Sequence, residues 1–111
     1  MTSFVRTSLH SKAEVITWSN MPQSTVGQPF EDFFGDRSIQ VEGTFGGASI
    51  TITGSNDGIN YRTLTDPLGS PLVISAPDIV QILETVRYTR PEVGGGVGTN
   101  LTISMFIRRS S

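Results

Sequence analysis

The chain has 111 residues, a length that fits one domain, and carries a formal net charge of −2. It contains no cysteine, which excludes disulfides and thiolate metal sites. Its eight Lys and Arg residues are scattered, so we expect no nucleic-acid partner. No apolar run approaches the ~20 residues that cross a bilayer, so we also expect no membrane partner.

The N-terminal residues 1–12 are mostly polar and predict an arm that becomes ordered only where something covers it. A single β domain is expected to follow over residues 13–111. Its first strand is predicted at Ala13–Trp18, which is rich in β-branched residues. The arm carries three apolar residues: Phe4, Val5 and Leu9.

Residues 20–36 hold two prolines and two glycines without sustained periodicity, and they predict a long loop. Phe30, Phe33 and Phe34 have the spacing of one helical turn, which would place three rings on one side. General burial preferences favour rings that close one end of the core. The alternative is that the rings anchor a partner subunit, because aromatic residues are enriched at interfaces.

The same loop contains three carboxylates, which raise the question of a cation site. Their spacing lacks the alternate-residue ligand pattern of a calcium loop. We therefore predict a solvated acidic loop and no metal site there. The residues are Glu31, Asp32 and Asp36.

The central segment, residues 37–64, predicts three short strands joined by two tight turns. Apolar residues alternate with polar ones in its first two strands: Ile39, Val41 and Phe45, then Ala48, Ile50 and Ile52. Gly46-Gly47 predicts a two-residue turn that pairs these strands as a hairpin. Asn56-Asp57-Gly58 predicts the second reversal, because these residues tolerate positive φ.

The C-terminal half continues the β pattern with one interruption. Residues 71–75 predict a short buried strand, and residues 76–84 predict a short capping helix from their early proline and helical apolar spacing. Residues 85–89 predict a further strand. Arg90-Pro91 is expected to end it, since proline cannot donate to a ladder.

The glycine-rich residues 92–100 lack the Lys-Ser/Thr of a phosphate-binding P-loop and predict a hairpin loop instead. Alternation over residues 101–107 then predicts the clearest strand of the chain. The expected fold is all-β: a small antiparallel β-sandwich or barrel, jelly-roll-like, of about six to eight strands with one short capping helix.

Residues that could carry chemistry are scarce. His10 is the sole histidine and lies in the predicted arm, where it could not be held beside a nucleophile or join other zinc ligands. Asp57, Asp66 and Asp78 each fit a turn or a helix start. We therefore expect no enzyme, with no catalytic, cofactor-binding or metal-binding residue.

One family resemblance emerges from the central segment and the residues C-terminal to it. The run VEGTFGGASITITGSNDGINYRTL, then a Pro/Gly turn, a short capping segment, RYTRP and a Gly-rich hairpin, resembles small structural proteins encoded among the head genes of tailed bacteriophages. The likeness covers about two-thirds of the chain and leaves out residues 1–36. The matching residues are Gly43, Phe45 to Ala48, Gly54 to Gly58, Asn60, Tyr61, Leu64, Arg87, Tyr88, Arg90 and Pro91.

The resemblance implies a capsid decoration, or cement, protein on the outer surface of the virion. Such a protein would stabilise the capsid by bridging major capsid protein subunits. The expected partners are the major capsid protein and further copies of the chain, as a dimer or trimer. Pairing between exposed strand edges of two copies is a further hypothesis. We predict these contact residues: Phe4, Val5, Leu9, Phe30, Phe33 and Phe34.

Two other functions stay open. S-N-D-G-x-x-aromatic also resembles a hairpin of discoidin-like sugar-binding sandwiches, which would make the chain a carbohydrate-binding module. Trp18 and Tyr61 are the obvious aromatic candidates, although Tyr61 shares the face of Ile59 and is expected to be buried. A tail or neck subunit of a phage is the third alternative.

Overall fold

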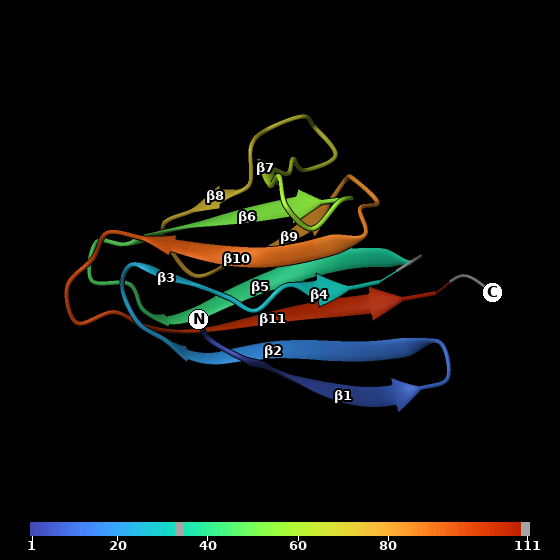
Figure 1. The fold of residues 1–111 in the computed structure, drawn as a ribbon. Helices are drawn as coiled ribbons and strands as arrows, with labels where there is room; N and C mark the ends of the chain where they lie inside the picture. Colours follow the sequence, from blue (N-terminus) through green and yellow to red (C-terminus); the bar gives the residue numbers. More distant parts are fainter. Residues whose placement is uncertain (33–34, 110–111) are drawn as a thin grey trace.

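Two antiparallel sheets make up the fold in the computed structural model, which describes residues 1–32 and 35–109 (Figure 1). The first sheet has the strand order β1-β2-β11-β5-β9, and the second has β3-β10-β6-β7 with β4 on β10 and β8 on β6. The strands are β1 (Phe4–His10), β2 (Ala13–Met21), β3 (Thr25–Val26), β4 (Phe30–Glu31), β5 (Asp36–Thr44), β6 (Ser49–Ser55), β7 (Arg62–Thr63), β8 (Val73–Ile74), β9 (Asp78–Ile82), β10 (Tyr88–Gly94) and β11 (Asn100–Arg108).

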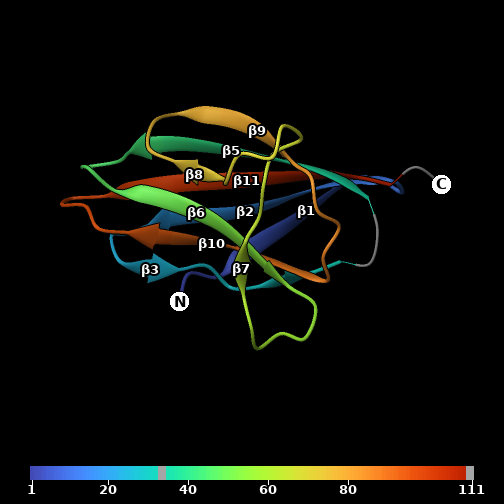
Figure 2. The same ribbon diagram turned by 90° about the horizontal axis from the view of Figure 1, so that it is seen from above.

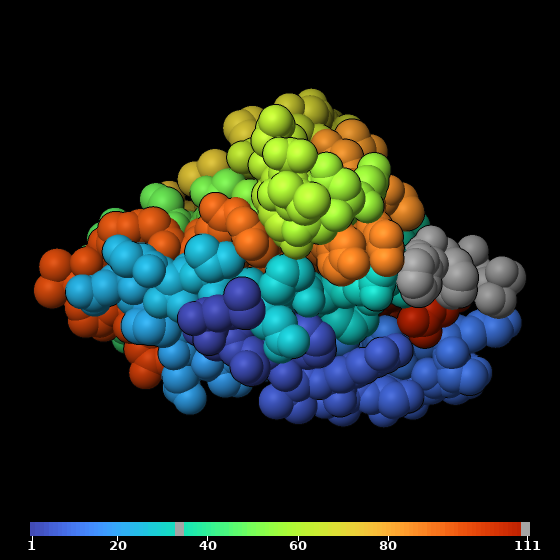
Figure 3. Space-filling view, in the orientation of Figure 1, coloured from blue at the N-terminus to red at the C-terminus, as the bar shows by residue number. Residues whose placement is uncertain are grey.

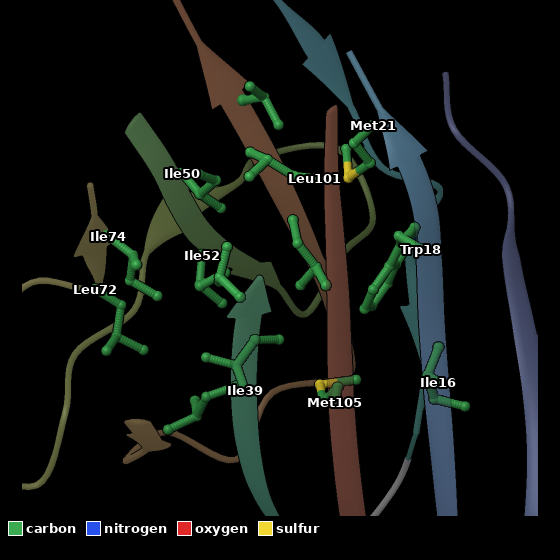
Figure 4. Close-up of a cluster of buried hydrophobic side chains, with 14 of the residues drawn as sticks. Ile16, Trp18, Met21, Ile39, Ile50, Ile52, Leu72, Ile74, Leu101 and Met105 are labelled. Carbon is green, nitrogen blue, oxygen red and sulfur yellow. The ribbon is translucent and has the colours of Figure 1, made fainter. Parts of the chain in front are cut away.

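The core lies between the two sheets, which face each other in two layers (Figure 2). Trp18, Ile39 and Met105 come from the first sheet, and Ile50 and Ile52 come from the second (Figure 4). All five are fully buried. The all-β prediction is confirmed and the layers are consistent with a sandwich. The strands outnumber the six to eight expected because four of them have only two residues.

The predicted hairpin around Gly46-Gly47 is wrong. β5 pairs with β11 and β9 in the first sheet, whereas β6 pairs with β10 in the second. The turn, closed by a 3.0 Å bond from the N–H of Ala48 to the carbonyl of Phe45, therefore carries the chain from one sheet to the other. Alternation correctly identified the buried face of each strand, but a buried face does not specify which strand lies beside it.

The second predicted hairpin, around the glycine-rich loop, is wrong for the same reason. β10 and β11 belong to different sheets, so residues 95–99 also cross between the layers. The N–H of Val97 donates to the carbonyl of Gly46 at 2.9 Å. The two crossings thus lie side by side at one end of the molecule, on the left in Figure 1.

The predicted capping helix over residues 76–84 is absent, and β9 occupies its place. Val80 lies beside Ile39 on the core side of β5, and Ile79 lies beside Gln40 on the opposite side. The helix was predicted from three apolar residues at helical spacing. In so short a run of β-branched residues, the pattern fits the period of a strand as well as that of a helix. The unpaired edge of β5 decides the outcome by supplying backbone partners.

The prediction that Pro91 ends its strand is also wrong, because β10 runs from Tyr88 to Gly94 and Pro91 pairs with Ile52. The carbonyl of Pro91 accepts a 2.8 Å bond from the N–H of Gly27, so its nitrogen also faces away from β6. On that side the partner of β10 changes from β4 to β3. The missing N–H therefore removes no bond from the β6 ladder.

The N-terminal segment predicted as an arm contains β1, which pairs with β2 over most of its length. The segment predicted as a long loop contains β3 and β4, both of which pair with β10. No helix in the described part of the chain is long and apolar enough to cross a membrane.

Candidate interaction surface

The six predicted contact residues lie in different environments. Phe30 is 3% exposed, and its ring centroid lies 5.3 Å from that of the half-buried Phe4, edge to face. Both rings therefore contribute to packing within the fold, and for Phe30 this is the interpretation that burial preferences favoured. Val5 is 64% exposed and Leu9 is 59% exposed on β1. Phe33 and Phe34 lie outside the described residues.

The side of the five-stranded sheet that faces away from the core, here called the outer face, shows an unusual composition. Strand register aligns its residues in two rows across all five strands: Gln81, Ser38, Phe106, Val15 and Thr7, then Ile79, Gln40, Ser104, Thr17 and Val5. Neither row contains an acidic or basic residue. Depletion of charge is the compositional mark of the centre of a protein–protein interface.

Phe106 forms the centre of the outer face. Its side chain is 39% exposed, and the outer face also exposes Ile79 to 63%. A hollow of about 200 Å³ lies on one side of Phe106 and includes Gln81 and Arg108 in its lining. A second hollow of about 240 Å³ lies on the other side and includes Val15. The ring thus stands between two depressions, each large enough to receive a side chain of a partner.

Sequence reasoning missed both Phe106 and Ile79. Phe106 falls on the polar side of the alternation in residues 101–108, so an aromatic among Thr, Ser and Arg was a usable signal. Ile79 was assigned to the predicted helix, and only the pairing of β9 with β5 places it on the outer face.

A buried ionic network lies on the core side of this sheet. It shows that the prediction of a solvated acidic loop is wrong for Asp32, whereas Glu31 and Asp36 are exposed as predicted. Asp32 is 4% exposed and Arg37 is 3% exposed, with their charged groups 3.9 Å apart. Arg37 also donates to the hydroxyl of Thr89 on the second sheet at 3.0 Å. Burial lowers the pKa of Arg37, while the carboxylate of Asp32 opposes that shift.

Glu14 and Arg109 extend this network. Arg109 Nη2 lies 3.1 Å from Glu14 Oε1 and 3.3 Å from Asp32 Oδ1. Glu14 also accepts from Arg6 Nε at 2.6 Å. The charges thereby connect β1, β2 and β5 with the segment before β5 and the end of the chain, which is a structural arrangement with paired charges.

The two aromatic residues predicted as candidates for sugar binding differ in burial. Trp18 is fully buried, and its Nε1 donates to the carbonyl of Gln28 at 3.0 Å. Tyr61 is half-buried with the guanidinium of Arg90 3.7 Å from its ring centroid. Ile59, expected to share the burial of Tyr61, is instead 81% exposed.

Among residues 1–32 and 35–109, no group of three or more His, Cys, Asp or Glu side chains could hold a metal ion. His10 is exposed on β1, and its Nδ1 accepts from the N–H of Lys12 at 3.3 Å. No protein-family model matches the chain, and no curated protein matches it. The resemblance to phage head proteins therefore stays a prediction.

Proposed function

We propose that the protein is a structural subunit that decorates a bacteriophage capsid and stabilises it by bridging major capsid protein subunits. The observation that carries the proposal is the outer face, a charge-free pair of rows with Phe106 exposed at its centre. A surface of this composition fits a protein partner. The family resemblance, which covers about two-thirds of the chain and leaves out residues 1–36, directs the proposal to the capsid.

The layered fold suits adhesion to a lattice. The outer face belongs to five hydrogen-bonded strands backed by the second sheet, so the backbone that carries its side chains is held in place before binding. Preorganisation lowers the conformational entropy lost on association. A subunit that binds the assembled lattice and not its free components stabilises the lattice by mass action.

The experiment measures co-sedimentation of the purified protein with heads of the virus that encodes it, stripped of this protein, and with free major capsid protein. Phe106→Arg and Ile79→Arg place charge on the outer face, and each should lower head binding at least about tenfold, because an interface would bury the charge unpaired. Ile59→Arg is the matched control, since Ile59 is equally apolar and 81% exposed outside the five-stranded sheet. Circular dichroism confirms that each variant is folded.

Two results would contradict the proposal: no preference for assembled heads over free subunits, or equal loss of binding in the outer-face and control variants. Selective binding to a glycan array would favour the carbohydrate-binding module. Ring-shaped assemblies of the purified protein would favour a tail or neck subunit.

A further inference from the structure

β1 forms one edge of the five-stranded sheet and runs along the lower rim of the molecule (Figure 3). The edge of β1 that points away from β2 is covered at its first residues. The N–H of Gln28 donates to the carbonyl of Thr2 at 2.7 Å, and the N–H of Phe4 donates to Gln28 Oε1 at 3.3 Å. Beyond Phe4, no described segment pairs with the edge of β1 that points away from β2.

The backbone beyond Phe4 is oriented for pairing. The N–H of Phe4 points away from β2, and successive peptide groups alternate along a strand, so the N–H and C=O groups of Arg6 and Ser8 also point outward. The side chain of Arg6 turns back to Glu14, with Nε 2.6 Å from Oε2. This charge is therefore paired within the same chain. An unpaired charge on an edge strand often hinders the pairing of another strand, and Arg6 does not act in that way.

The opposite edge of the same sheet, β9, is less open. The outward N–H of Ile79 donates to Asp78 Oδ1 at 2.8 Å. The N–H of Leu83, on the same side just beyond the strand, donates to the carbonyl of Thr65 at 2.9 Å. Because these donors are already used, β1 is the edge that favours another strand.

We propose that two copies of the chain pair through β1, antiparallel, about a two-fold axis at Thr7. This register places Arg6 opposite Ser8 of the second copy as a hydrogen-bonded pair, using the outward groups of both residues. It also brings Val5 near Leu9 of the second copy, which lies at the bulge between Ser8 and His10, so two exposed apolar side chains lie close together on either side of the axis. Moving the axis to Arg6 would set two arginines opposite each other, which is unfavourable.

The pairing joins the outer faces of both copies into one continuous sheet surface, with five strands from each copy. It does not rest on the proposed function. A contact limited to residues 5–9 buries less than the roughly 1,200 Å² of a standard stable interface, so the dimer is expected to dissociate readily on dilution. Copies held close together on a larger surface would pair far more completely.

Cysteine cross-linking tests the register, because the natural chain contains no cysteine. Thr7→Cys places two thiols in a non-hydrogen-bonded pair with Cα atoms about 4.5 Å apart, within the range of a disulfide. Val5→Cys is the matched control on the same strand and outer face. Its two thiols would lie roughly 13 Å apart, too far for a bond. Mild oxidation of concentrated protein should link Thr7→Cys at least about tenfold faster than Val5→Cys.

A second measurement needs no cysteine. Sedimentation equilibrium of the natural protein should show a concentration-dependent dimer that Thr7→Lys abolishes, because two ammonium groups would meet at the axis. Thr102→Lys, on the exposed side of β11, should leave the dimer unchanged. Equal or absent cross-linking of the two cysteine variants would overturn the proposal, as would self-association that Thr7→Lys does not alter.

Discussion

Asp57 shows how a single side chain shapes a turn. Its Oδ1 accepts from the N–H groups of Asn60 and Ile59, each at 2.8 Å, and from the hydroxyl of Ser55 at 2.8 Å. Gly58, the residue after Asp57 in this turn, has a positive φ of 75°. The bond from the N–H of Asn60, then that from Ile59, holds the pKa of Asp57 well below its usual range.

Asp57→Asn keeps an oxygen acceptor and removes the charge, so it isolates the contribution of ionisation. The folded-state pKa is depressed, so this stability is present above the unfolded pKa of about 3.9 and is lost as pH falls through the folded value. We expect the variant to be less stable than the natural protein at neutral pH, with a difference that shrinks below about pH 4. Urea unfolding across pH 3 to 7 measures this; a difference independent of pH would contradict it.

Asp32 and Asp36 lie four residues apart and differ in burial, which makes them a matched pair. Asp32 faces the buried Arg37, whereas Asp36 pairs with Arg108 at 3.4 Å where both side chains are about two-thirds exposed. Asp32→Asn should lower the free energy of unfolding by about 3–5 kcal/mol, because it leaves Arg37 as an uncompensated buried charge. Asp36→Asn should cost about 0–1 kcal/mol, since solvent screens an exposed pair.

Chemical denaturation of both variants at neutral pH gives the comparison. Similar losses for the two substitutions would show that Asp32 does not compensate Arg37. The sequence signalled neither case, because a carboxylate in a polar loop has the same local pattern whether it is solvated or buried.

The two connections that cross between the sheets depend on glycine at one particular place. Gly46 has a φ of 59°, and a Cβ built there would lie 2.0 Å from the carbonyl oxygen of Val97. Gly47 has a φ of 85°, but a Cβ there would meet open space. The adjacent glycines thus separate the cost of positive φ from the cost of close contact between the crossings.

Gly47→Ala should destabilise the fold by about 1–2 kcal/mol, the cost of a left-handed conformation for an ordinary residue. Gly46→Ala should cost about 1–3 kcal/mol more, because the backbone of residues 95–99 must move to relieve the overlap. Thermal and urea unfolding measure both values. If the two variants lose equal stability, the contact between the crossings contributes nothing.

At the scale of strands, the sequence predicted where strands occur better than it predicted which strands lie beside each other. Alternation located β5, β6 and β11 and their buried faces, and β-branched residues located β2. It assigned both glycine-rich turns to hairpins because a tight turn between two amphipathic strands is also the local pattern of a hairpin. Only the separation of the strands into two sheets distinguishes a hairpin from a crossing.

At the scale of the whole molecule, the two sheets divide the tasks. The second sheet and the core hold the five-stranded sheet in place, and the outer face and the β1 edge of that sheet are the surfaces proposed for a capsid partner and for a second copy. The two proposals can be separated experimentally. Phe106→Arg tests the face and Thr7→Cys tests the edge, and either can fail without the other.

The candidate surface was partly predictable. Val5 and Leu9 were named from the sequence and are exposed, whereas Phe4 and Phe30 were named with them and pack against each other inside the fold. Their burial depends on the chain of residues 26–30 passing beside β1, a contact between distant segments that local sequence does not encode. The exposure of Ile79 depends on the pairing of β9 with β5, which the sequence did not predict.

The amino-acid sequence by itself determined that the chain is a β protein and which side of β5, β6 and β11 is buried, because a period of two follows directly from backbone geometry. Tertiary structure decided which strands are neighbours, that Asp32 and Arg37 meet in the interior, and that two rows of the outer face lack charge across five strands. The alternation of apolar and polar residues in a strand is the same whichever strand pairs with it. Pairing is therefore chosen by the whole set of available edges and by how the two layers fill their common core.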